Sequence, residues 1–147
     1  MPNIRRLLTV IGLAVAITAI QVNAGAWAQQ NTMRIAAIVN EDLISVFDLQ
    51  SRVRWVVLTT GIKPDNQNQR RIIQQVLRSM VDDRLRLQEA ERLGIRVTDR
   101  EIDQEISGLA NRNNMTAEVF TNRLTEQNVD MGTVRNLIRA SLAWAKV

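Results

Sequence analysis

Residues 80–124 constrain the fold more than any other part of the sequence, because they contain three helices with explicit start and stop signals. A long amphipathic helix ends at Gly94, a residue type that readily terminates helices in the left-handed conformation. Thr98 and Glu101 form a capping box at the start of the next helix. Thr116 then starts the third. These signals predict a mostly α-helical domain with short linkers.

The remaining elements are predicted from composition and from cap residues. Two short strands rich in Ile and Val, at residues 34–39 and 43–46, form a hairpin. Ser45 caps the first helix and Gly61 is its stop. Residues 62–68 make up the stretch that composition marks as a loop. The helices that complete the domain are expected at about residues 68–93, 99–111 and 117–127, and from residue 131, behind the cap Asp130, to the chain end.

The order and spacing of these elements closely resemble the amino-terminal module of the SurA family, which comprises periplasmic chaperones and parvulin-type prolyl isomerases of Gram-negative bacteria. The resemblance rests on the helical stretch MVDDRLRLQEAERLGIRVTDREIDQEISGLANRNNMTAEVFTNRL, on IAAIVNEDLIS at residues 35–45 and on TVRNLIRASLAWAKV at residues 133–147. It covers nearly all of the chain after residue 28. It implies a SurA amino-terminal chaperone domain over residues 29–147, with a short β-hairpin at its start and a signal peptide before it.

The resemblance also bears on activity. In the SurA family the chain continues through one or two parvulin domains, and a carboxy-terminal helix then returns to complete the chaperone core. We expect this sequence, which ends at Val147, to lack both parts, so that no catalytic residue of the family has a counterpart here. The groove that receives the returning helix would then be open.

Composition excludes several classes of enzyme without reference to any family. The chain has 147 residues, no Cys and no His, which rules out Ser-His-Asp and Cys-His nucleophiles, thiolate chemistry and conventional zinc sites. The Asp82-Asp83 pair does not suit paired-carboxylate chemistry, because consecutive helical residues point about 100° apart. We therefore expect no catalytic residues, no metal site and no cofactor.

Residues 1–28 have the features of a cleavable export signal. Arg5 and Arg6 supply the positive charge, an apolar run of 14 residues spans positions 7–20, and Ala-Trp-Ala stands at residues 26–28. The run is shorter than the roughly 20 apolar residues of a comfortable membrane span. We expect cleavage after residue 28, a periplasmic location and no stable membrane insertion. An uncleaved inner-membrane anchor is the alternative.

The charge pattern does not indicate a nucleic-acid partner. Without Arg5 and Arg6 the domain carries 17 basic and 15 acidic residues, and both signs alternate through residues 78–105. Such alternation is typical of a solvated helix face, and the sequence has no basic run with interleaved aromatic residues. We therefore expect no nucleic acid among the partners.

Helical periodicity divides the first helix into a core face and a second apolar stripe. Phe47, Trp55 and Leu58 lie off the core face, with Ser51 between them. A soluble domain seldom leaves two large aromatic side chains in water without a partner. The residues predicted for the core face are Val46, Leu49, Val53, Val56 and Val57.

The second and last helices show the same excess of apolar residues. The second is apolar over more than half its circumference and includes Met80, whose unbranched side chain suits surfaces that accept varied sequences. On the last helix, Leu137 and Trp144 lie off the core stripe. Packing between crossing helices explains any of these residues, and a seat for the returning family helix is a further alternative. The residues predicted to bind peptide are Phe47, Trp55, Leu58, Met80, Leu137 and Trp144.

The resemblance implies an ATP-independent holdase for unfolded outer-membrane proteins. Its mechanism would be reversible apolar contact with extended, aromatic-rich segments, which otherwise pair edge to edge and aggregate. One alternative is an amino-terminal fragment of a peptidyl-prolyl cis-trans isomerase whose parvulin catalytic domain is missing. Another is a membrane-tethered chaperone that retains its leader.

Overall fold

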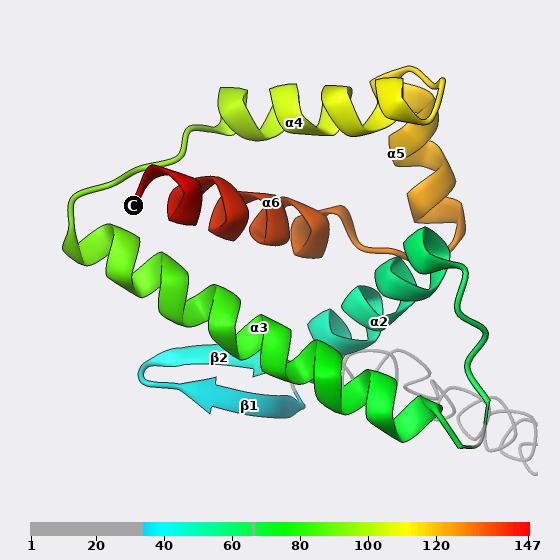
Figure 1. Cartoon of the computed structure of the whole chain (residues 1–147), viewed down its shortest axis with the longest axis horizontal. Coiled ribbons are helices and arrows are strands. Elements are labelled where there is room, and N and C mark those ends of the chain that lie inside the picture. Colours follow the sequence, from blue (N-terminus) through cyan, green and yellow to red (C-terminus); the bar gives the residue numbers. More distant parts are fainter. Residues whose placement is uncertain (1–33, 66) are drawn as a thin grey trace, which may run out of the picture. The chain divides into compact units, whose positions relative to one another are not determined.

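The computed structural model describes residues 34–65 and 67–147, so the predicted leader and its cleavage site lie outside the described residues. The described part is mostly α-helical with a two-stranded hairpin at its start (Figure 1), which confirms the predicted fold class. None of its helices has the length and hydropathy of a membrane span. The elements are β1 (Ile35–Val39), β2 (Asp42–Ser45), α2 (Val46–Thr60), α3 (Gln69–Arg92), α4 (Asp99–Arg112), α5 (Ala117–Glu126) and α6 (Met131–Lys146).

The hairpin is antiparallel and closes through a two-residue turn. Asn40 takes a φ of 55° in that turn, a conformation that Asn tolerates better than most residues. Gln88 of α3 donates to the carbonyl oxygen of Val39 at 3.1 Å and to the Asp42 carboxylate at 2.8 Å, so the hairpin is tied to the long helix. Asp42 is the first residue of β2, whereas the sequence predicted that the strand begins at residue 43.

Most helix boundaries are set by local capping, as the sequence predicts. At the start of α2, α4, α5 and α6, the side chain of the residue before the helix accepts a hydrogen bond from the backbone N–H three residues later. Gly61 and Gly94 stop α2 and α3 with φ values of 67° and 71°. The exception is Asn68 before α3, whose side chain makes no capping bond. The four caps are Ser45, Thr98, Thr116 and Asp130.

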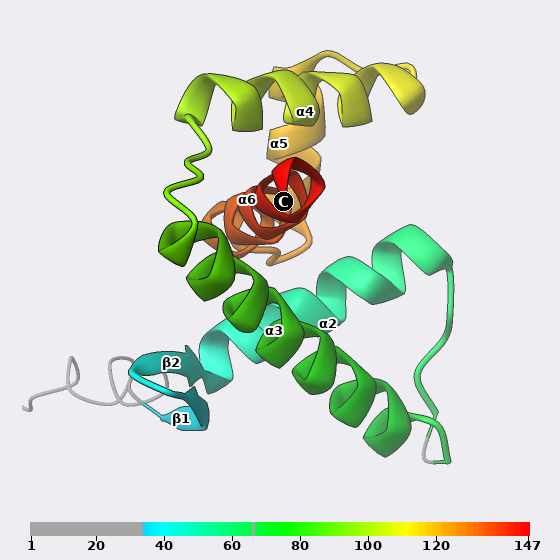
Figure 2. The same ribbon diagram turned by 60° about the vertical axis from the view of Figure 1, so that its left-hand side comes forward.

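Two apolar clusters form the core. The hairpin cluster lies where the hairpin, α2 and α3 meet, and the C-terminal cluster lies between α4, α5 and α6. Helices α3 and α6 lie side by side and join the two regions (Figures 1 and 2). The hairpin cluster contains Val39, Ile44, Leu49, Val76 and Met80, and the C-terminal cluster contains Ile102, Ile106, Ala110, Phe120, Leu124, Val129, Val134 and Ile138.

The buried face of α2 differs from the predicted one. Of the five residues assigned to the core face, only Leu49 is buried and the four valines are half-buried. Ser51, assigned to the looser stripe, is completely buried, and Arg52 beside it is 5% exposed. The reason is that α2 packs against both α3 and α6, so its best-buried side carries polar groups that bond to those helices.

Candidate functional site

An apolar concavity that contains two of the predicted peptide-binding residues lies between the end of α2, the end of α4 and α5, whose labels can be followed in Figure 1. We call it the aromatic cavity. It encloses about 370 Å³ and is open to solvent. Its size suits one bulky side chain of a partner. It is lined by Trp55, Leu58, Thr59, Leu109, Asn113, Met115, Phe120, Arg123, Leu124 and Gln127.

Two aromatic rings from distant parts of the sequence form the wall of the aromatic cavity. The ring of Trp55 meets that of Phe120 edge to face, with centroids 6.4 Å apart and planes at 90°. Phe120 is buried in the C-terminal cluster, whereas Trp55 is half-buried. The Thr116 cap fixes the start of α5 and thus the position of Phe120. A rigid ring pair of this kind is a preformed contact for another apolar group.

Trp55 has two roles that the sequence presented as alternatives. The structure packs its ring against the C-terminal cluster, so it is not simply off the core. The same side chain also lines the aromatic cavity with Leu58, which is 43% exposed. The predicted second stripe of α2 therefore lines the aromatic cavity near the carboxyl end of the helix.

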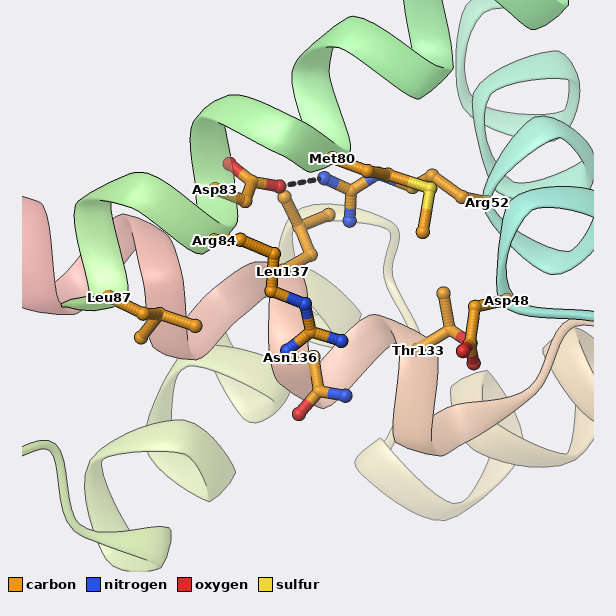
Figure 3. A pocket seen from close by; sticks show the side chains of 9 residues that line it. All are labelled: Asp48, Arg52, Met80, Asp83, Arg84, Leu87, Thr133, Asn136 and Leu137. Atoms are coloured by element: carbon orange, nitrogen blue, oxygen red, sulfur yellow. Dashed lines mark hydrogen bonds and ion pairs between the residues drawn. The ribbon is translucent and has the colours of Figure 1, made fainter. Parts of the chain in front are cut away.

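Two other predicted residues, Met80 and Leu137, line a smaller concavity between α2, α3 and α6, shown in Figure 3. We call it the polar pocket. Its volume of about 30 Å³ has room for about one water molecule, not for a side chain. Met80 is 9% exposed and belongs to the hairpin cluster. Intramolecular packing is therefore the better explanation for Met80.

A buried ion pair forms one wall of the polar pocket. Arg52 donates to the Asp83 carboxylate at 2.5 Å, and the two side chains are 6% and 14% exposed. Burial lowers the pKa of the Arg52 guanidinium and raises the pKa of the Asp83 carboxyl, and the charge of each partner opposes the shift of the other. Removing Asp83 would leave the Arg52 guanidinium buried without compensation, whereas removing Arg52 would leave Asp83 with the Arg86 guanidinium at 3.6 Å. Asp83 of the Asp82-Asp83 pair thus serves an ion pair with a residue of another helix, and its carboxylate also lies 3.6 Å from the Arg86 guanidinium.

Further hydrogen bonds complete the junction between α2 and α6. The backbone N–H of Asp130 donates to the Ser51 hydroxyl oxygen at 2.8 Å. The Thr133 hydroxyl donates to the Asp48 carboxylate at 3.3 Å. These bonds join the amino-terminal halves of both helices, so the position of Trp55 on α2 is fixed relative to α6. The described residues include no group of three acidic side chains placed to hold a metal ion.

The last two predicted residues lie apart from both concavities. Trp144 is 47% exposed and has the Arg86 guanidinium 5.8 Å from its ring centroid. It lines a shallow surface depression with Leu85. Phe47 is exposed and lines neither the aromatic cavity nor the polar pocket. The six predicted residues therefore do not form one surface: Trp55 and Leu58 share the aromatic cavity, and Met80 and Leu137 share the polar pocket.

Sequence reasoning missed the other walls of the aromatic cavity. Leu109 and Leu124 come from α4 and α5, and Arg123 stands at the rim. Periodicity marked none of them, because it reports which face of one helix is apolar and not which helix ends converge. The capping residue Thr116 was the available signal, since it placed the start of α5 close behind α4.

Comparisons with known proteins agree with this architecture. The family model described as SurA N-terminal domain matches residues 32–147. A relative named Chaperone SurA from Pseudomonas fluorescens (strain Pf0-1) is 34% identical over 125 residues, which cover 82% of this chain and 28% of the relative. Chaperone SurA from Salmonella choleraesuis (strain SC-B67) is 31% identical over 124 residues with the same coverage. The chain spans about 28% of the length of these relatives.

Proposed function

Because this chain belongs to the SurA N-terminal domain family, we propose that it acts as an ATP-independent holdase module for unfolded outer-membrane proteins in the periplasm. The family membership and the relatives named as chaperones support the chaperone class. The structural observation that carries the proposal is the aromatic cavity, with Trp55 and Phe120 in its wall and Leu58 at its edge.

The mechanism is reversible apolar contact. An extended client places a bulky side chain in the aromatic cavity, where the exposed surface of Leu58 and the half-buried ring of Trp55 are covered. Each 100 Å² of apolar surface removed from water contributes roughly 2.5 kcal/mol before other costs. Ordering a flexible client offsets much of that gain, so affinity is modest and release needs no ATP.

A matched pair of leucines tests whether the cavity holds clients. Leu58 and Leu85 are 43% and 45% exposed, but only Leu58 lines the aromatic cavity. Leu58→Ser should weaken suppression of outer-membrane protein aggregation severalfold, while Leu85→Ser should not. Because both side chains are largely exposed, both variants should keep melting temperatures within a few degrees of the parent. Equal suppression by the parent and Leu58→Ser would contradict the proposed site.

Trp55→Ala is a more severe variant of the same test. The loss of its ring removes a cavity wall and also the edge-to-face contact with Phe120. We expect weaker suppression of aggregation together with a loss of stability of about 1 to 3 kcal/mol, because the ring is half-buried. Denaturant melts separate the two effects, since client binding is measured well below the unfolding midpoint. Normal suppression by folded Trp55→Ala would move the client site to the surface around Trp144.

The periplasmic part of the proposal rests on residues 1–28, which carry the pattern of a cleavable export signal. Intact mass of the exported protein should show loss of these residues. A protein of full mass in the membrane fraction would favour the membrane-tethered alternative.

A further inference from the structure

The charge at the rim of the aromatic cavity is positive. Among the described residues that line it, Arg123 is the one that carries a charge. Arg123 is exposed, and none of the ion pairs within the described part of the chain includes it. A free guanidinium therefore stands beside an apolar concavity. That combination favours a ligand with both an apolar and an anionic group.

The acidic residues of α5 do not neutralise this rim. Leu124 is buried and marks the inward face of the helix. At about 100° per residue, Glu118 and Glu126 lie roughly 120° and 160° away from that face. Both are exposed and neither lines the cavity. Glu126, three residues after Arg123 and about 60° from it around α5, makes no ion pair with Arg123 within the described part of the chain.

The other helices around the mouth add positive and not negative charge. On α4, Glu105 accepts from Arg112 at 2.9 Å, so this carboxylate is already paired. On α2, the Arg54 guanidinium donates to the carbonyl oxygen of Asn128 at 2.6 Å, one residue beyond the lining residue Gln127. A carboxylate that approaches the cavity therefore meets the guanidinium of Arg123, whereas an ammonium group meets no acidic side chain among the lining residues.

Two of the three neutral polar side chains that line the cavity are already bonded. The Thr59 hydroxyl donates to the carbonyl oxygen of Trp55 at 2.9 Å, and the Asn113 side-chain amide donates to that of Leu109 at 2.8 Å. The ligand's polar contact is consequently left to Arg123, with the side-chain amide of Gln127 one helical turn away. Discrimination between ligands should then follow charge.

We propose that the aromatic cavity selects client segments in which a bulky apolar side chain has a carboxylate at the next position, and that Arg123 is the specificity-determining residue. This inference rests on the proposed function and names the class of segment held at that site. Rim charges act mainly on specificity and on association, so the preference adds to apolar binding without replacing it.

The test uses dye-labelled, amidated peptides Gly-Ser-Phe-X-Ser-Gly in which X is Asp, Asn or Lys. Fluorescence anisotropy with the full chain gives three affinities. We expect Asp to bind better than Asn, and Asn better than Lys, by about threefold at each step, the scale of an exposed ion pair. In about 1 M salt the three affinities should converge, because the Debye length falls to about 3 Å.

Charge reversal at the rim distinguishes a specificity role from a structural one. Arg123→Glu should invert the order so that the Lys peptide binds best, and Arg123→Gln should remove the order while leaving the Asn peptide unchanged. Arg100→Glu, a change at another exposed residue that lies outside the cavity, should keep the parent order. Thermal melts check that each variant is folded.

Several outcomes would overturn the inference. If all three peptides bind the parent equally, charge plays no part in selection, although binding of the Asn peptide would leave the proposed function intact. An order that persists in Arg123→Glu would place the selecting charge elsewhere. If no peptide binds while sedimentation shows self-association that Leu58→Ser abolishes, the occupant of the cavity is a second copy of the chain.

Discussion

The hairpin region, formed by β1, β2, α2 and α3, uses charge differently from the C-terminal region, formed by α4, α5 and α6. In the hairpin region, the ion pair of Arg52 with Asp83 is buried. In the C-terminal region, Arg135 and Lys146 of α6 bind acidic residues near the start of α4 at the surface. The same kind of contact therefore lies in two environments with different dielectric properties.

This difference determines what each contact does. A buried pair tolerates no loss of one partner, because the remaining charge has no water to solvate it. An exposed pair contributes little, since water solvates both groups when they separate. The buried pair fixes the position of α2 against α3, and α2 places Trp55 in the wall of the aromatic cavity. The walls from α4 and α5 depend instead on caps and apolar packing.

The largest expected effect comes from Asp83→Ala. It leaves the Arg52 guanidinium buried without its carboxylate, which should lower the free energy of unfolding by about 3 to 5 kcal/mol. Urea denaturation measures the loss. Asp82→Ala, on an exposed neighbour, should stay within about 0.5 kcal/mol. If Asp83→Ala lowered the free energy of unfolding less than the Asp82 control, the packing of α2 against α3 would not depend on the ion pair.

Thr98→Ala should have the next largest effect, because it removes the capping box of α4. Its hydroxyl accepts from the Glu101 N–H at 3.3 Å, and the Glu101 carboxylate accepts from the Thr98 N–H at 2.8 Å. We expect a loss of about 1 kcal/mol in the free energy of unfolding. Thr98→Ser keeps the hydroxyl and should restore most of it. Equal stability of the Ala and Ser variants would show that the cap contributes nothing.

The acid limb of stability should depend on Glu101. The hydrogen bond from Lys146, followed by those from the Thr98 backbone and side chain, holds the pKa of Glu101 at about 2, below its ordinary value of 4.5. A depressed carboxyl pKa stabilises the fold above the unfolded-state value, and this contribution is lost as pH falls from about 4.5 to about 2. Glu101→Gln should therefore flatten the melting temperature across that window. An unchanged pH profile would contradict the assignment.

Arg135→Ala should have the smallest effect of the four. Its guanidinium binds Asp99 at 3.1 Å and Asp103 at 2.5 Å, and both carboxylates are well exposed. We expect a loss of at most about 1 kcal/mol, which should shrink further in high salt. Thermal melts at low and high ionic strength measure it. A loss as large as that of Asp83→Ala would remove the distinction between the two regions.

The sequence by itself determined the elements of this fold. Ser45, Thr98, Thr116 and Asp130 each satisfy backbone N–H groups of the residues that directly follow, and Gly94 accepts a left-handed φ without steric cost. Both effects act over one helical turn. They can therefore be read from neighbouring letters, and the helix boundaries agree with the structure to within about two residues, as such assignments allow.

The tertiary structure alone decided which residues share a site. Ser51 is buried because Asp130, far away in the sequence, places a backbone N–H against it. Met80 is core because the hairpin folds over α3, whereas Trp55 gains a cavity because α5 brings Phe120 to it. Periodicity assigns an apolar face to a helix but not the element that covers it. Which element covers an apolar face depends on how the helices cross, and no local sequence pattern encodes that crossing.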